Sequence, residues 1–296
     1  MNLRGLGEER LVQEVILPQL TQSGAVVAGA GDDCAVVRLA GTKKLLVLKT
    51  DCVVAGVHFA PDAQPAAIGW KAMARALSDF AAMSALPQFA LVTLLAPPET
   101  EVLWTKGLYR GLGKAARAFE VAIVGGETSA GPLAISVSLT GVVEKERWVS
   151  RSGGKAGDVL FVTGTLGGSI RGKHLRFTPR IAEARWLTQH FRVHAMMDLS
   201  DGLGADLPRL ARASKVGFEL EEGAIPRTRG CSVAEAISDG EDYELLLAIP
   251  PNECRKLETG WSRRFPRLQL TRIGCLTEQK SEIRNQKFPT GYAHFR

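Results

Sequence analysis

Acidic residues carried by several separate segments, each beside small or apolar residues, constrain this chain more than any other feature. They are Asp32 and Asp33 after Gly31, Asp51 after Thr50, Asp79 in Leu-Ser-Asp-Phe, and Asp198 and Asp201 in Asp-Leu-Ser-Asp-Gly. A carboxylate in an apolar environment is costly unless a cation compensates it, and the neighbouring sequence offers few Lys or Arg residues. Oxygen ligands without adjoining His or Cys suit Mg²⁺, which keeps positions for water and phosphate. The sequence therefore predicts a fold that gathers these segments at a nucleotide-phosphate site.

Length and composition indicate a globular enzyme with two domains. A chain of 296 residues is long enough to form two domains, each with its own hydrophobic core. With 45% hydrophobic and 23% charged residues, disordered and fibrous classes are excluded. The net charge of +6 is modest and scattered, so we expect a solvated basic surface and no nucleic-acid partner.

The cysteine spacing and the hydropathy pattern indicate the cellular compartment in which the protein is expected. The five cysteines show no C-x-x-C pair and no zinc or disulfide spacing, which is typical of reduced thiols. The first residues lack an apolar signal region, and no run approaches the ~20 apolar residues that span a bilayer. We therefore expect a cytoplasmic protein without membrane association.

Hydrophobic periodicity predicts alternating helices and strands in both halves. Helices are expected over 8–20, 65–85, 101–119 and 201–214, and strands over 34–39, 44–51, 91–95, 121–124, 134–143, 159–163, 217–220 and 244–249. The second of these strands is expected to end at Asp51. The glycine-rich stretch 150–158 is the best candidate boundary, which gives domains 1–149 and 150–296.

Each acidic motif also has a simpler structural interpretation. Asp32 and Asp33 could form a turn, and Asp51 could be a cap or an edge residue. Asp79 follows Arg75 by four positions, so the two could form a helical ion pair worth ~0.3 kcal/mol. The segment 198–201 could begin a helix with Ser200 or Asp201 as the cap, although free N–H groups at a helix start also attract phosphate.

Other motifs are weaker. The glycine segments 125–128 and 164–168 are read as loops, and neither is a Walker A loop. A lone histidine between apolar residues, such as His58, is often buried in a core, although His58 closely follows Asp51. No nucleophile elbow is present, so covalent catalysis has no support.

Several motifs together resemble the thiamine-monophosphate kinase family. They are Gly31-Asp-Asp-Cys, Lys49-Thr-Asp-Cys-Val-Val-Ala-Gly-Val-His-Phe, Leu77-Ser-Asp-Phe, Gly125-Gly-Glu-Thr, Val149-Ser-Arg-Ser-Gly, Asp198-Leu-Ser-Asp-Gly, Gly240-Glu-Asp-Tyr-Glu and Gly291-Tyr-Ala-His-Phe. The resemblance implies the α/β (α+β) fold of the aminoimidazole ribonucleotide synthetase-like superfamily, with an N-terminal half-barrel domain, a C-terminal α/β domain and a homodimer. It also implies Mg²⁺-assisted transfer of the ATP γ-phosphoryl group to thiamine monophosphate.

The resemblance assigns roles residue by residue. Metal contacts fall on Asp33, Thr50, Asp51, Asp79, Glu127, Asp198 and Asp201. ATP contacts fall on Tyr109, Gly126, Glu127, Arg151 and Ser200, and thiamine contacts on His58, Glu241 and Tyr292. A carboxylate and an aromatic ring are chemically suitable partners for a cationic thiazolium.

The chain departs from the family pattern at a few positions. Glu127 stands where Asp is usual, Lys49 where a metal-facing Ser or Thr is common, and Asp239 where Gly is usual. The Lys49 ammonium could replace a cation or turn away. Two alternatives remain open: a member of the superfamily with a different acceptor, and an ATP-binding protein that has lost catalysis.

Overall fold

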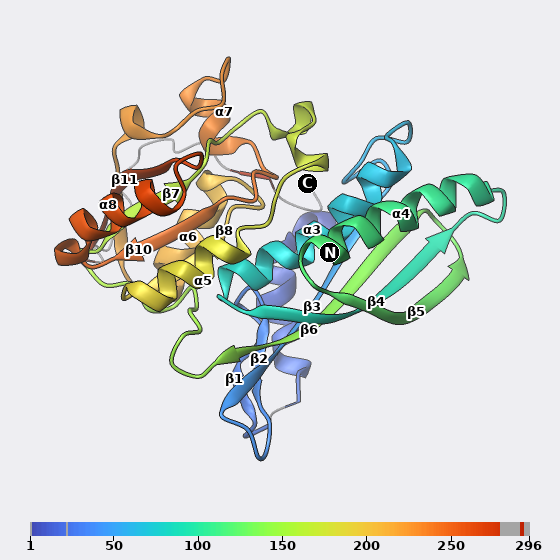
Figure 1. The fold of residues 1–296 in the computed structure, drawn as a ribbon, viewed down its shortest axis with the longest axis horizontal. Coiled ribbons are helices and arrows are strands. Elements are labelled where there is room, and N and C mark those ends of the chain that lie inside the picture. The colour runs from blue at the N-terminus through green and yellow to red at the C-terminus, as the bar shows by residue number, and fades with distance from the viewer. Residues whose placement is uncertain (1, 22, 279–290, 293–296) are drawn as a thin grey trace.

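The computed structural model describes residues 2–21, 23–278 and 291–292, and Figure 1 shows two sheets with helices packed around them. The first part of the chain contains α1 (Leu3–Leu6), α2 (Glu8–Arg10), η1 (Leu11–Ile16), η2 (Leu17–Gln19), β1 (Val26–Ala28), β2 (Ala35–Arg38), β3 (Lys44–Val54), α3 (Pro65–Ala82), β4 (Leu86–Ala96), α4 (Val102–Ala118), β5 (Ala122–Ala130) and β6 (Ala134–Glu144). The second part contains β7 (Val159–Thr163), η3 (Ser169–Arg171), η4 (Lys173–Leu175), α5 (Ile181–His190), β8 (Ala195–Asp198), α6 (Leu203–Ser214), β9 (Gly217–Leu220), η5 (Glu222–Ala224), α7 (Val233–Ser238), β10 (Leu245–Ile249), η6 (Pro251–Glu253), α8 (Cys254–Arg264) and β11 (Leu270–Thr277).

The first sheet has the strand order β1-β2-β3-β6-β4-β5. Its neighbours pair antiparallel except β4 and β5, which are parallel and joined by α4. The long helices α3 and α4 lie together over one face (Figure 1). Side chains on that face are buried, while alternate side chains of β4 on the other face, including Phe89 and Leu91, are exposed. This sheet therefore has one covered and one open face.

The second sheet has the order β8-β10-β7-β11-β9, and all its strand pairs are antiparallel. Strands β7, β8 and β10 are buried on both faces. Side chains of α5 and α8 belong to one hydrophobic cluster, and side chains of α6 and α7 belong to the other. The sheet is thus a layer between two pairs of helices.

Helix α3 connects the two parts of the molecule. Pro65 stands at its first turn, where a missing N–H is tolerated, and the helix is buried over most of its length. It packs against α4 and β3 on one side and against α5 and β8 on the other. One hydrophobic cluster runs from the first sheet through α3 to the α5 and α8 side of the second sheet. This central position places polar side chains of α3 between the two sheets.

The structure corrects several expectations about single elements. Strand β3 continues through Asp51 to Val54, and the predicted glycine loop 125–128 lies inside β5. The predicted helix 8–20 is a series of short α, π and 3₁₀ segments. Helix α6 begins only at Leu203, with Gly202 at its N-cap, so neither Ser200 nor Asp201 is the cap. Helices α5 and α8 and strands β8 and β11 were not predicted, because their short or polar sequences carry weak periodicity. The domain boundary at 149/150 stays a prediction.

Candidate functional site

Three aspartates from three different elements converge at the centre of the molecule. Asp33 precedes β2, Asp79 lies in α3, and Asp198 ends β8. Each offers a carboxylate oxygen, and these oxygens lie within 4.8 Å of one another. All three residues are buried. The sequence-predicted gathering of acids is thus found in the structure for these three residues.

The surroundings of this cluster leave part of its negative charge without a partner. Arg151 forms an ion pair with Asp33 through Oδ1, whereas the buried Oδ2 of Asp33 has no hydrogen-bond partner among the described residues. Ser78 Oγ donates to Asp198 Oδ2 at 2.5 Å. Burial and the neighbouring carboxylate of Asp33 raise the pKa of Asp198 to about 7. Burial also raises the pKa of Asp79 well above its ordinary value. Buried carboxylates without a compensating positive charge have raised pKa values, and a divalent cation would supply that positive charge.

Asp51 lies beside this cluster on the same face of β3 as Lys49. Its Oδ2 is 3.2 Å from Nε of Arg75, and Lys49 Nζ is 3.0 Å from Oδ2 of Asp79. The alternative of an Arg75–Asp79 helical pair is therefore wrong, since each partner pairs with β3 instead. Lys49 does not turn away from the acids.

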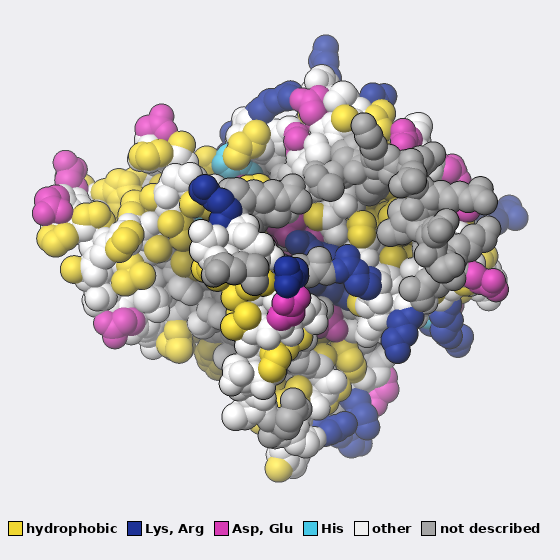
Figure 2. Space-filling view, turned by 180° about the vertical axis from the view of Figure 1, so that it is seen from behind, with side chains coloured by type: hydrophobic (Ala, Val, Ile, Leu, Met, Phe, Trp, Pro, Cys, Tyr) yellow, Lys and Arg dark blue, Asp and Glu magenta, His cyan; other side chains and the backbone are white. Residues whose placement is uncertain are grey.

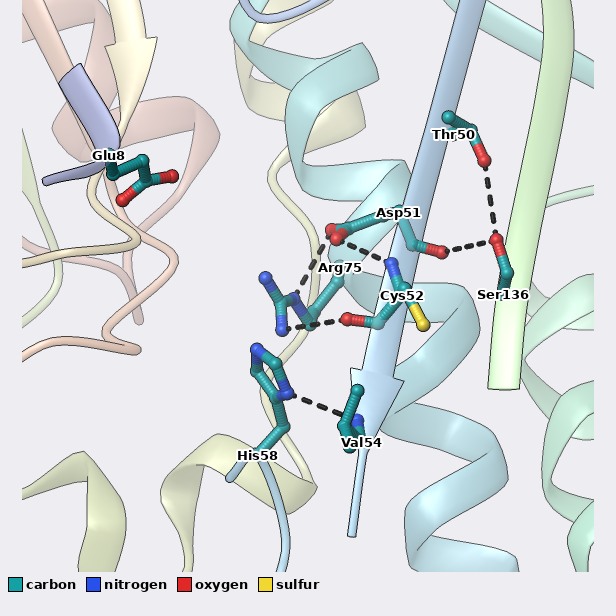
Figure 3. A pocket seen from close by; sticks show the side chains of 8 residues that line it. All are labelled: Glu8, Thr50, Asp51, Cys52, Val54, His58, Arg75 and Ser136. Carbon is teal, nitrogen blue, oxygen red and sulfur yellow. Dashed lines mark hydrogen bonds and ion pairs between the residues drawn. The ribbon is translucent and has the colours of Figure 1, made fainter. Parts of the chain in front are cut away.

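A pocket of about 410 Å³ opens beside β3. It is lined by Glu8, Thr50, Asp51, Cys52, Val54, His58, Arg75 and Ser136 (Figure 3). Thr50 Oγ1 lies 3.0 Å from Ser138 Oγ and 3.3 Å from Ser136 Oγ, on the side of the strand opposite to the Asp51–Arg75 pair. Successive side chains of a strand point to opposite faces, so the Thr50 hydroxyl and the Asp51 carboxylate do not converge on one point.

The remaining predicted metal positions lie apart from the three-aspartate cluster. Asp201 forms an ion pair with Arg209, which also binds Asp206 at 2.8 Å. Glu127 is exposed on β5, and its carboxylate accepts a hydrogen bond from the Thr128 N–H at 3.1 Å. The register pairs Glu127 with Thr93, on the face of the sheet that carries the exposed Leu91.

The predicted nucleotide contacts are only partly brought together. Arg151 lies at the cluster, and its N–H donates to Asp32 Oδ1 at 3.0 Å. Ser200 lies two residues after Asp198, and its carbonyl accepts from the Glu241 N–H at 2.7 Å. Tyr109 is half-exposed on α4, and Gly126 lies in the edge strand β5. Neither has a hydrogen bond to the cluster in the described part of the chain.

The predicted thiamine contacts His58 and Glu241 are linked by Lys71. This lysine is 0% exposed, donates to the His58 carbonyl oxygen, and forms an ion pair with Glu241. Burial lowers the pKa of Lys71 to about 8, partly opposed by Glu241. The His58 ring accepts from the Val54 N–H through Nδ1 at 3.0 Å. Tyr292 N–H donates to the Asp201 carbonyl at 2.9 Å, while positions 293–295 of the terminal motif lie outside the described residues.

Lys71 was not among the predicted site residues, and Arg75 was predicted only as a partner of Asp79. The signal was present, because Lys71, Arg75 and Asp79 follow one another at intervals of four in a helix whose other residues are apolar or small. Residues four apart share a helix face, so three charged groups at this spacing indicate one polar stripe inside the protein.

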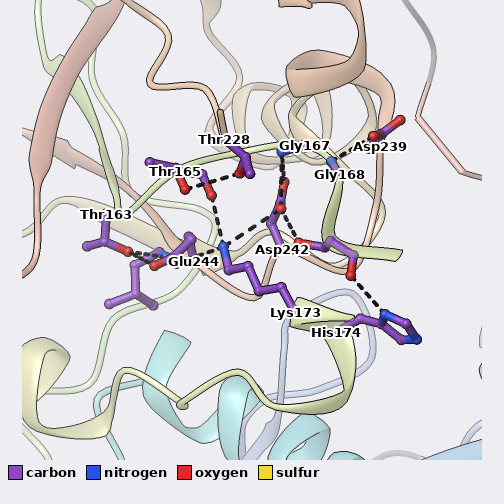
Figure 4. A network of polar contacts seen from close by, with 12 residues as sticks. Thr163, Thr165, Gly167, Gly168, Lys173, His174, Thr228, Asp239, Asp242 and Glu244 are labelled. Atoms are coloured by element: carbon purple, nitrogen blue, oxygen red, sulfur yellow. Dashed lines mark hydrogen bonds and ion pairs between the residues drawn. The ribbon is translucent and has the colours of Figure 1, made fainter. Parts of the chain in front are cut away.

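A buried polar network holds the segment that carries Glu241. Asp242 accepts from the Gly167 N–H at 2.9 Å and from Ser169 Oγ at 2.5 Å, and Glu244 accepts two bonds from Arg180 at 2.8 Å each (Figure 4). Glu241 itself has a φ of 65°, which is uncommon for a residue with a side chain. Asp239, which stands where the family usually has glycine, accepts a hydrogen bond from the Gly168 N–H at 2.8 Å. The network holds the residues on both sides of Glu241 in place.

Comparison with known proteins agrees with this architecture. Residues 31–143 match the AIR synthase related protein N-terminal domain, and residues 155–284 match the corresponding C-terminal domain. The thiamine-monophosphate kinase of Rhodopirellula baltica is 39% identical over 291 residues, covering 91% of this chain and 92% of that protein. The enzyme of that name from Aquifex aeolicus is 33% identical and covers both chains fully. The fold expected from the resemblance is thereby confirmed.

Solved structures agree with the sequence relatives. The structure of AaThiL complexed with AMPPCP and TMP superposes with a TM-score of 0.84 at 32% identity, covering 99% of both chains. The thiamine-monophosphate kinase of Stenotrophomonas maltophilia K279a gives a TM-score of 0.75 at 30% identity, covering 91% of this chain and 94% of that one. The chain therefore belongs to the thiamine-monophosphate kinase family.

Proposed function

We propose that this protein transfers the γ-phosphoryl group of ATP to thiamine monophosphate, forming thiamine diphosphate and ADP in one Mg²⁺-dependent step. The observation that carries the proposal is the convergence of Asp33, Asp79 and Asp198 in a chain of this family. An oxygen atom of the substrate phosphate attacks the γ-phosphorus in line. The bond from that phosphorus to the β–γ bridging oxygen breaks, and its electrons leave with ADP.

The residues present fit Mg²⁺. The donors are carboxylate oxygens, and the buried Asp33 Oδ2 lacks a hydrogen-bond partner among the described residues. We assign Asp33, Asp51, Asp79 and Asp198 to the metal, with Thr50, Glu127 and Asp201 at further positions around the nucleotide. When bound, Mg²⁺ would screen the repulsion between two polyanions.

The chain's own residues bind and orient the substrates. Tyr109, Gly126, Glu127, Arg151 and Ser200 are assigned to ATP, and His58, Glu241 and Tyr292 to thiamine monophosphate. Glu241 faces the cationic thiazolium with its direction set by Lys71. A phosphate monoester has a second pKa of ~6, so the acceptor is already ionised near neutral pH and needs no general base.

We further propose a homodimer built on the open face of the first sheet. Phe89 and Leu91 of β4 are each 49% exposed, and Val124 of the edge strand β5 is 60% exposed. Figure 2 shows hydrophobic side chains gathered over the side of the molecule that carries β4 and β5. A large apolar patch on a sheet with an unpaired edge is typical of a protein interface, and a second copy offers a complementary patch.

Two expectations concern location. All five cysteines are free thiols, which supports our proposal of a cytoplasmic protein. Within the described residues, none of the helices combines the length and the apolar character needed to cross a bilayer.

The test is formation of thiamine diphosphate and ADP from purified protein, ATP and thiamine monophosphate, with and without Mg²⁺. We expect product only with Mg²⁺, and a loss of at least about 100-fold in Asp51→Ala. Asp62→Ala, at an exposed aspartate after β3, is the matched control and should retain activity. ATP binding without product would instead support a non-catalytic role or another acceptor.

A further inference from the structure

Lys49, in strand β3 of the first sheet, contacts the cluster formed by Asp33, Asp79 and Asp198. It lies in β3 opposite Leu139 of β6, and its side chain takes the buried face that also carries Asp51. Its Nζ is 3.0 Å from Oδ2 of Asp79, one of the three converging aspartates. The Lys49 ammonium is thus part of the cluster itself.

The charge on Lys49 is maintained in this place. Two carboxylates lie beside the ammonium group: Asp79, whose Oδ2 is 3.0 Å from Nζ, and Asp51, two residues further along the same face of β3. The side chain is only 23% exposed, so solvent screens its charge weakly. Lys49 therefore places a single positive charge beside these carboxylates.

The compensation of the acids is uneven. Asp79 pairs with Lys49, Asp51 with Arg75, and Asp33 with Arg151 through one oxygen only. Asp198 has the Ser78 hydroxyl but no ion pair among the described residues, and Asp33 Oδ2 is buried without a partner there. The uncompensated charge is therefore concentrated on Asp198 and on Oδ2 of Asp33, neither of which forms an ion pair with Lys49.

We propose that the Lys49 ammonium permanently fills one cation position of this cluster, so that the nucleotide-free cluster binds one divalent cation fewer than it would with a neutral residue at position 49. The metal that does bind sits on the Asp33–Asp198 side. The repulsion between an ammonium and a divalent ion at a few ångströms keeps a second ion from Asp79. This inference rests on the metal site of the proposed function.

The test is a Mn²⁺ titration of nucleotide-free protein, with free Mn²⁺ followed by electron paramagnetic resonance. Wild type, Lys49→Met and Lys44→Met are compared under the same conditions. Lys44→Met removes an exposed lysine from the start of the same strand, so it controls for a general loss of positive charge. We expect one additional Mn²⁺ ion per chain in Lys49→Met, and the wild-type number in Lys44→Met. The same number in all three proteins overturns the proposal.

Further variants guard against misfolding and identify the site. Lys49→Gln is a second neutral variant and should also gain one ion, while Lys49→Arg keeps the charge and should bind the wild-type number. Asp198→Asn should lose Mn²⁺ in the wild-type background. If Asp198→Asn binds as wild type does, the metal site of the proposed function fails. If Asp198→Asn loses an ion while the neutral variants at Lys49 gain none, only the inference about Lys49 fails.

Discussion

The ammonium group of Lys71 in α3 and the carboxylate of Glu241 form an ion pair between residues 170 positions apart in the chain. Lys71 also donates to the His58 carbonyl, so one fully buried side chain joins the two segments assigned to the thiamine substrate. A buried charge that loses its partner is costly, and its surroundings rearrange to hydrate it. The relative position of these two segments therefore depends on this lysine.

Replacing Lys71 by Met should raise the KM for thiamine monophosphate by about tenfold, because Glu241 and the His58 loop lose their shared anchor. Since the pKa of Lys71 is lowered to about 8, its charge is lost as the pH rises through about 8. The wild-type KM should then rise above this pH, whereas the variant should show a high KM with no such rise. Steady-state kinetics from pH 6.5 to 9.5, on the order of three units around this pKa, measure both effects.

Lys106→Met on the exposed side of α4 is the control for the loss of one positive charge, and it should keep the wild-type profile. An unchanged KM in Lys71→Met across this range would show that Lys71 does not orient the substrate residues.

Glu144 and Arg185 join the first sheet to α5, and their bond makes stability depend on acid pH. Arg185 donates to both carboxylate oxygens, at 2.6 and 3.0 Å, and these bonds lower the pKa of Glu144 from 4.5 to about 2. A lowered folded-state pKa stabilises the protein above the unfolded value, and this contribution is lost as the pH falls from 4.5 to about 2. Because Glu144 is partly exposed, we expect Glu144→Gln to cost only about 0.5–1 kcal/mol at pH 7.

Urea unfolding of Glu144→Gln and wild type at several pH values measures this difference. It should be constant above about pH 5 and shrink at lower pH. Glu146→Gln, at an exposed position two residues further on, should match wild type throughout. A difference for Glu144→Gln that does not change with pH would contradict the ion-pair explanation.

The close approach of β5 to β4 at Gly126 can be tested by comparing substitutions at Gly126 and at its neighbour Gly125. The φ of Gly126 is 154°, and a Cβ there would lie 1.8 Å from the Val92 carbonyl oxygen in the parallel partner strand. A Cβ on Gly125 would meet only a Leu91 methyl group, at 3.4 Å. We expect Gly126→Ala to lower the free energy of unfolding by about 2 kcal/mol or more, and Gly125→Ala to change it by less than about 1 kcal/mol. Equal effects in thermal and urea unfolding would show that β4 and β5 do not approach this closely.

Leu91→Lys tests the proposed homodimer. The substitution places a charge on the open face of the first sheet, which would have to be desolvated in an interface. We expect the variant to sediment as a monomer at a protein concentration where wild type is a dimer. Val102→Lys is the control, because Val102 is 70% exposed at the start of α4, outside the sheet. Wild type that sediments as a monomer at all concentrations would rule out the dimer.

The sequence by itself determined the family to which this protein belongs. Oxygen-only acidic motifs predicted a phosphate and metal site, and their order along the chain indicated the family that the comparisons then showed. The long amphipathic and Ala-rich helices α3 and α4 were also predicted closely, because a strong periodicity over many residues leaves little choice of structure.

Only the tertiary structure decided which charged groups meet. Arg75 is four residues from Asp79, yet it pairs with Asp51, and Asp79 pairs with Lys49. Thr50 and Asp51 are adjacent in sequence but point to opposite sides of β3, because both lie inside the strand and successive side chains alternate. Such pairings depend on how sheets and helices pack across long sequence distances. Local propensity fixes the period of an element, but the element's neighbours fix which face is buried and which partner each charge finds.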